Sequence, residues 1–437
     1  MSAHLTAHAI SGRADLPLPL PLFLYGAGFA LVASFLALRA LWPDPKLAVA
    51  AEGDAAPGWV QGSVRVLAVV LRVVGAVAYL VVLIAAVAGA DDQTRNIAPV
   101  AFYVLFWVGL QLLSAVAGNV WRYLSPFETA ADVLGLGDTE VRSQWPAAGV
   151  LLGFAWLELA YTQPSRPRVV AVALVIHLAV LVAGMAVRGR GWLRSADGFG
   201  VLFSFLALLS PVFCDGAGRV RFRAPGSGLS TLVIRPGTVA VIQVALGATA
   251  FDGLSRSSYW RSLAGGVTGW TRTGYATVGL IVSLAAVVGV WELACSQIPR
   301  FTSGPRRAGA PDDDRDPTER FAHSLIPIAL AYAIAHYFST LVFEGQSAIA
   351  LVSDPFGRSW DLFGTAARTI DYTLVSTGAI AFVQAGAVVL GHVAGVVGAH
   401  DRAVETLPAK AAARSQHPLL VAMVTYTVAA LALLLGA

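Results

Sequence analysis

Long apolar runs recur along almost the whole of this chain, separated by short stretches that contain Arg, Pro or Gly. A bilayer core about 30 Å thick needs about 20 residues of helix to cross it, and most of the runs reach that length. The composition agrees, because 57% of the 437 residues are hydrophobic and only 13% are charged. Too little polar surface remains to solvate a globule of this size, so the sequence predicts a polytopic integral membrane protein.

The predicted fold is all-α, a bundle of about eleven transmembrane helices with a range of about ten to twelve. The runs that predict these helices cover residues 20–41, 64–89, 99–119, 147–162, 169–187, 199–213, 237–254, 274–296, 322–343, 375–399 and 418–436. The fourth and sixth runs are short, and they fit tilted, re-entrant or broken spans.

The polar loops are too short to fold as separate domains. The most highly charged loop, 297–321, separates a predicted membrane bundle over 1–296 from the last predicted spans over 322–437. Its stretch from Arg306 to Arg320 mixes Asp with Arg, which predicts a solvated and flexible connector.

The 30 basic residues are all arginine apart from Lys46 and Lys410, and they are spread over many loops. This thin distribution predicts no nucleic-acid partner; the predicted partner is the lipid bilayer. The predicted location is the bacterial cytoplasmic membrane, with many passes. Arginines are densest in the 219–235 and 300–320 loops, which with alternating spans predicts that these loops and the N-terminus lie inside.

Ionisable residues inside the apolar runs are the candidates for function, because an unpaired charge at membrane depth is costly. Counting from the ends of alternating spans places these polar residues in two groups, one toward each face of the membrane. The first group is Asp252, His336 and Gln384, with Glu344 near the edge, and the second is Glu158, His177 and His392, with His400 and Asp401 at the boundary.

Asp252 and His336, with Glu344 or Gln384, would supply the three ligands that a catalytic zinc or similar divalent ion requires. The chain has no HExxH or other compact zinc motif, so hydrogen bonds between helices explain the histidines equally well. Asp252 stands before Gly253 and four residues before Arg256, so it could also end a helix or pair with that arginine.

Several segments together resemble a family of polytopic bacterial membrane proteins labelled fenitrothion hydrolase-like. These segments are FDGLSR at 251–256, AHYFS at 335–339, DPFGRSWDLFG at 354–364, GH at 391–392 and AHDR at 399–402. The resemblance runs from about residue 64 to the end, and the stretch from Asn119 to Phe127 fits the same pattern.

This resemblance implies hydrolysis of organophosphate esters, in which a divalent metal ion would activate water. It implies that Asp252 and His336 are ligands and that His392 lies near them or in a second site. It also implies that Asp401 orients His400.

The first functional hypothesis is therefore a metal-assisted hydrolase of phosphate esters, with Asp252, His336 and His392 as catalytic candidates and a small-molecule substrate. Ionisable groups near both faces and Gly-interrupted helices fit a solute or proton-coupled transporter as well. A structural subunit of a membrane complex is the third hypothesis, in which the polar residues only join helices.

Overall fold

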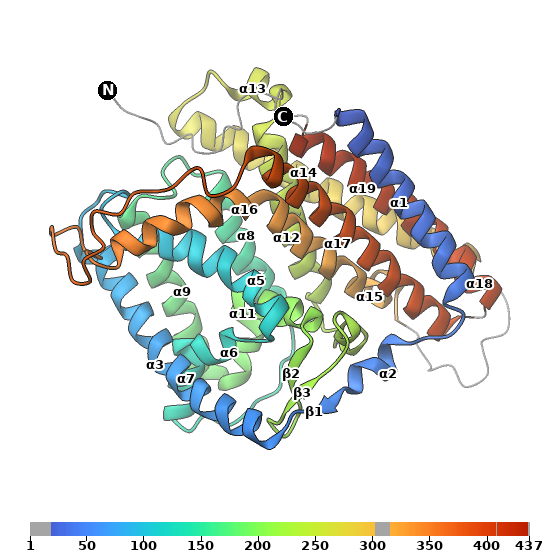
Figure 1. Cartoon of the computed structure of the whole chain (residues 1–437), viewed down its shortest axis with the longest axis horizontal. Coiled ribbons are helices and arrows are strands. Elements are labelled where there is room, and N and C mark those ends of the chain that lie inside the picture. The colour runs from blue at the N-terminus through green and yellow to red at the C-terminus, as the bar shows by residue number, and fades with distance from the viewer. Residues whose placement is uncertain (1–18, 302–314, 408, 436–437) are drawn as a thin grey trace.

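The computed structural model describes residues 19–301, 315–407 and 409–435, and it is a bundle of helices (Figure 1). Nine helices in these residues are long and apolar enough to cross a membrane. They are α1 (Leu20–Leu41), α3 (Gly58–Ala88), the continuous helix Ile97–Ala117, α9 (Pro167–Arg188), α12 (Thr238–Arg256), α14 (Gly269–Gln297), α16 (Ile326–Leu351), α17 (Thr377–Thr406) and α19 (His417–Leu435). A multi-pass membrane protein is thus supported, whereas the count of about eleven spans is not confirmed.

The helix Ile97–Ala117 has three parts: α4 (Ile97–Pro99), a π-helical stretch (Val100–Gly109) and α5 (Leu110–Ala117). Helix α8 (Trp145–Leu159) is shorter than the others. The remaining short helices are α2 (Leu47–Glu52), α6 (Trp121–Leu124), α7 (Pro126–Val133), α10 (Leu193–Ala196), α11 (Gly198–Leu206), α13 (Ser258–Ala264), α15 (Pro317–Arg320) and α18 (Ala409–Ser415).

One end of the bundle carries a small antiparallel sheet, and we call it the sheet end. Its strands are β1 (Asp54–Ala55), β2 (Val212–Cys214) and β3 (Val220–Phe222), in the order β1-β3-β2. The opposite end consists of the loops 89–96, 160–166 and 352–376 and of the segment 257–268, which contains α13. Arg166 joins two of these loops through Asp91, at 2.6 Å between Nε and Oδ2, and the backbone N–H of Ala90 donates to the Phe356 carbonyl.

Helices α8 and α12 run parallel, since both begin at the sheet end and both end at the opposite end. At their starts the Thr238 hydroxyl donates to Gln144 Oε1 at 2.6 Å. At their ends Ala160 and Phe251 share one apolar cluster. Helix α9 returns to the sheet end, where the Thr139 hydroxyl donates to the carbonyl of Arg188.

The segment 190–209 therefore leaves the sheet end and comes back to it. Its two halves, Arg190–Ala196 and Gly198–Leu209, are bent by 77°. The next residue, Ser210, donates to the Val116 carbonyl at the close of α5, again at the sheet end. The predicted sixth span at 199–213 is consequently a re-entrant segment, because it starts and finishes on the same side.

The last helices pack into the same core as the first ones. Helix α16 lies against the π-helical stretch and α12, and α19 lies against α1 and α14. Within α17, a side chain at Gly391 would clash with Ala331 and one at Gly395 would lie 2.7 Å from the Ser324 carbonyl, so glycine allows the close approach of α16. Most of the predicted connector at 306–320 lies outside the described residues, and the division at 297–321 stays a prediction.

The re-entrant segment changes the predicted orientation. Helix α1 is parallel to α17, with Phe23 against Phe382 at the opposite end and Trp42 bound to Asp401 at the sheet end. The start of α1 and the arginine-rich loop 219–235 thus lie on different sides of the membrane. The prediction that the N-terminus lies inside required both to be on the same side, so its premise is contradicted. The described basic residues of the opposite end are Arg95, Arg166, Arg168, Arg256, Arg261, Arg272, Arg358 and Arg368, and the others lie at or near the sheet end.

The excess of positive charge at the sheet end predicts that this end faces the cytoplasm. In a variant without Cys214 and Cys295, a single cysteine at Arg358 should react with an impermeant maleimide in intact cells. A single cysteine at Ala217, in the turn between β2 and β3, should react only after the membrane is permeabilised. Labelling of both positions from the same side would contradict the re-entrant topology.

Candidate functional site

A buried charged group lies where α12 meets α16, in the half of the bundle nearer the opposite end. The Asp252 carboxylate accepts from Arg256 Nη2 at 2.8 and 2.7 Å, on its two oxygens. His336 Nδ1 lies 3.1 Å from Asp252 Oδ2. Asp252 is 4% exposed and His336 is 5% exposed, so one carboxylate, one guanidinium and one imidazole are held together inside the bundle.

The local sequence explains this group. Asp252 and Arg256 are four residues apart, so they lie on the same face of α12 and can pair directly. Gly253 lets α16 approach, because a Cβ at this position would lie 3.2 Å from Cε1 of His336. The predicted pairing of Asp252 with Arg256 is confirmed, and so is the predicted proximity of Asp252 to His336.

A second carboxyl group lies beside the first. The Tyr337 hydroxyl, next to His336 on α16, donates to Glu158 Oε1 at 3.2 Å. Glu158 lies in the last turn of α8, which is parallel to α12, so it lies near Asp252 and Arg256. The prediction that Glu158 lies toward the other face was wrong, because it counted the re-entrant segment as a full crossing.

Two other predicted residues extend the polar group along α17. Gln384 donates from Nε2 to the Ala335 carbonyl at 2.7 Å, which confirms its predicted depth beside His336. His392 is fully buried, its Nδ1 lies 2.8 Å from the Val388 carbonyl, and its Nε2 has no hydrogen-bond partner among the described residues. The Tyr332 ring lies between the two histidines, at 5.8 Å from His392 and 6.4 Å from His336.

The remaining candidates lie at a distance from this group. His177 Nε2 is 3.6 Å from Asp197 Oδ1, at the re-entrant segment. His400 contacts Gln416 and the Trp42 carbonyl, and Asp401 accepts from the Trp42 indole at 2.8 Å. These contacts bind the end of α1 to α17, and no hydrogen bond joins Asp401 to His400 within the described parts of the chain.

The arrangement does not bring the proposed metal ligands together. Glu344 lies eight residues after His336 on α16, about 12 Å along the helix. Both oxygens of Asp252 are already engaged by Arg256, and one of them by His336 as well. In residues 19–301, 315–407 and 409–435, no group of three or more His, Cys, Asp or Glu side chains is placed to hold a metal ion.

Sequence reasoning missed Tyr337 and Tyr332. Both flank His336 on α16, one residue and four residues away, and helical spacing alone places Tyr332 on the same face as the histidine. The contact between Tyr337 and Glu158 could not be predicted in this way. It depends on the position of α8, which follows only from the correct topology.

Comparisons of the chain with family models, with curated proteins and with solved structures found no match. The function must therefore be argued from the residues and their arrangement.

The charged group makes a prediction about stability. Replacing Arg256 by Ala leaves the buried Asp252 carboxylate without its main counter-charge, and this should cost about 3 kcal/mol of unfolding free energy. The neutral double variant Asp252→Asn/Arg256→Gln should lose less, because no lone charge stays buried. Unfolding of the detergent-purified protein by increasing SDS measures both.

Arg272→Ala is the matched control, since Arg272 is an exposed arginine of α14 at the same end of the bundle. A loss in Arg256→Ala no larger than in this control would contradict the assigned role of the Asp252–Arg256 pair.

Proposed function

We propose that this protein is a proton-coupled transporter of the bacterial cytoplasmic membrane. The observation that carries the proposal is the Asp252 carboxylate, which is buried among spanning helices and shared between Arg256 and His336. Ionisable residues at such depth are costly to stability, and in membrane proteins they mark ion and proton pathways.

Contacts from Arg256 and His336 favour the carboxylate form of Asp252, and proton coupling requires a second, protonated state. As a carboxylate it attracts the Arg256 guanidinium, whose side chain is 33% exposed toward the opposite end. A proton on Asp252 removes that attraction and frees Arg256 to turn toward water. Protonation thus changes a contact between the buried group and the bundle exterior, which is the kind of two-state element that transport requires.

Other groups in the same region can exchange protons with Asp252. His336 Nδ1 contacts Oδ2 of Asp252, and Glu158 accepts a hydrogen bond from Tyr337, the residue after His336 on α16. His392 Nε2, beside the Tyr332 ring, is a buried ring nitrogen without a hydrogen-bond partner among the described residues. Buried polar atoms of this kind are satisfied by water or by a bound solute.

Irregular segments inside the bundle also favour transport. Transporters commonly contain interrupted helices that line a cavity at membrane depth. This chain has the bent pair Arg190–Ala196 and Gly198–Leu209 and the long π-helical stretch Val100–Gly109.

Proteoliposomes with a trapped pH dye test the proposal. With a membrane potential imposed, at least one solute from a panel of sugars, amino acids and organic anions should drive a pH change above that of empty liposomes. Asp252→Asn and His336→Gln should reduce the rate to less than about a tenth, because each removes a proton-binding group. His417→Gln, an exposed histidine at the start of α19, should leave the rate unchanged.

Proton movement equal in wild-type and Asp252→Asn vesicles would contradict the assigned role of Asp252. No proton movement with any solute would favour a structural role in a membrane complex.

Hydrolysis of phosphate esters is the second candidate. It is favoured by the resemblance to fenitrothion hydrolase-like proteins and by the Asp252–His336 pair, since a carboxylate on Nδ1 orients an imidazole as a general base. The divalent ion stays a prediction, because the described residues do not form a three-ligand group for it.

Release of nitrophenol from aryl phosphate esters by purified protein, lost in His336→Gln, would support the hydrolase. About one zinc or similar ion per chain, absent from Asp252→Ala and His336→Ala, would support metal assistance. Neither result is expected if the protein is a transporter.

A further inference from the structure

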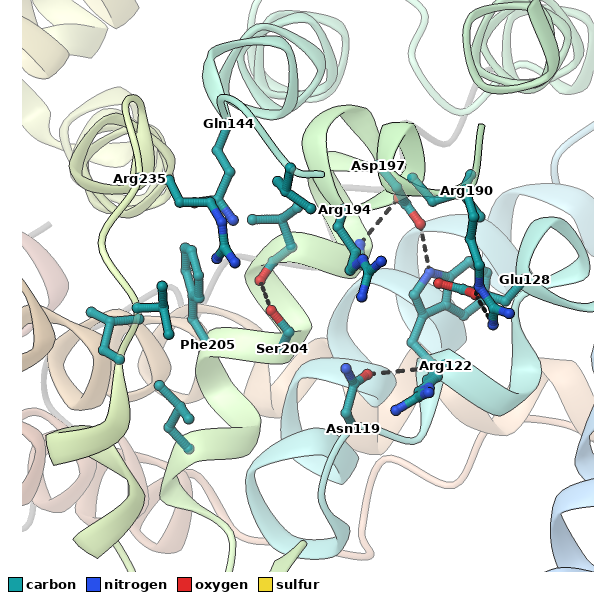
Figure 2. Close-up of a pocket in the computed structure, with 18 of the residues that line it drawn as sticks. Asn119, Arg122, Glu128, Gln144, Arg190, Arg194, Asp197, Ser204, Phe205 and Arg235 are labelled. Carbon is teal, nitrogen blue, oxygen red and sulfur yellow. Dashed lines mark hydrogen bonds and ion pairs between the residues drawn. The ribbon is translucent and has the colours of Figure 1, made fainter. Parts of the chain in front are cut away.

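A cavity of about 320 Å³ lies at the sheet end, beside the re-entrant segment and the loops that precede α8 and α12. Figure 2 shows Arg122, Arg194 and Arg235 around it, and Arg190 also lines it. The four arginines come from α6, from residues 190–194 and from the loop before α12. Such a wall attracts anions unless carboxylates neutralise it.

Two of the four arginines are neutralised. Arg190 binds Glu128 at 2.6 Å and Asp132 at 2.5 Å. Arg194 binds Asp138 at 2.7 Å. These ion pairs fix the shape of the cavity wall, but they leave little of the positive charge of Arg190 and Arg194 for a ligand.

The last carboxylate of the wall, Asp197, is also occupied. It accepts from the Trp121 indole at 2.8 Å and from the backbone N–H of Gly200 at 3.1 Å, at the start of α11. Its oxygens are held by these neutral donors, and it forms no ion pair with Arg122 or Arg235 among the described residues.

Arg122 and Arg235 remain with free guanidinium groups. Neither side chain makes a hydrogen bond or an ion pair in the part of the chain that the structure describes. Two amides add donors: Asn119 Oδ1 accepts from the Arg122 backbone N–H and Gln144 Oε1 accepts from Thr238. Their NH₂ groups are thereby left for a ligand.

Much of the rest of the wall is apolar. It is formed by Val201, Phe205 and Leu208 of the re-entrant segment and by Leu232 and Val233. Donor groups and apolar side chains line the same cavity, and this combination matches a ligand with a charged head and an apolar body.

We propose that this cavity binds a phosphate group attached to an apolar body, with Arg122 and Arg235 as its main ligands. Guanidinium groups match phosphate oxygens in paired hydrogen bonds, and the two amides supply further donors. The phosphate could belong to a lipid headgroup of the inner leaflet or to a soluble organic phosphate. The proposal concerns binding alone and does not depend on transport or hydrolysis.

The test uses the full chain in phosphatidylcholine nanodiscs. Phenyl phosphate, titrated by calorimetry, probes the soluble source, and phosphatidylglycerol retained through purification, measured by native mass spectrometry, probes the lipid source. Arg122→Gln/Arg235→Gln should weaken binding of the preferred probe at least about tenfold, since two charge-assisted contacts are lost. Arg142→Gln is the control, because Arg142 is 84% exposed at the same end and lies outside the cavity.

Loss of phenyl phosphate binding in the double variant supports the site with a soluble ligand, and loss of retained phosphatidylglycerol supports it with a lipid. The Arg122→Lys/Arg235→Lys variant should recover part of the affinity, which excludes misfolding as the cause. Binding of both probes that is equal in wild type and double variant, or absent from the wild type, would overturn the proposal.

Discussion

The ion pair between Asp252 and Arg256, completed by His336, is the interaction on which this account of the bundle rests. A lone carboxylate at this depth would destabilise the fold, but a guanidinium four residues away and an imidazole from α16 offset its charge. The contact of His336 with Asp252 joins α16 to α12. The hydrogen bond from Tyr337 to Glu158 joins α16 to α8. Packing and the proposed chemistry involve the same contact, because a proton taken up by Asp252 would alter its contact with His336 on α16.

The re-entrant segment is the second constraint on function. It makes α8 and α12 parallel, and so allows Glu158 and Asp252 to lie in the same half of the membrane. It also forms one wall of the arginine-lined cavity at the sheet end. The buried charged group and the cavity thus lie toward different ends of the bundle.

Much of the architecture could be predicted from the sequence, because a membrane span leaves a direct signal in about 20 apolar residues. The proximity of Asp252, His336 and Gln384 followed from their depth along three spans, and the pairing with Arg256 followed from helical spacing. The position of Glu158 could not be predicted, since one misassigned crossing reverses the depth of residues relative to later spans. Composition cannot distinguish a 199–213 run that crosses from one that bends back by 77° at residue 197.

The central claim is that Asp252 changes its protonation state within the folded bundle. Infrared difference spectra of the reconstituted protein, recorded between neutral and acidic pH, measure this directly through the carbonyl band of a protonated carboxyl group. The account predicts such a band in the wild type, absent from Asp252→Asn and shifted in Arg256→Gln. A spectrum that is the same in the wild type and Asp252→Asn would contradict it.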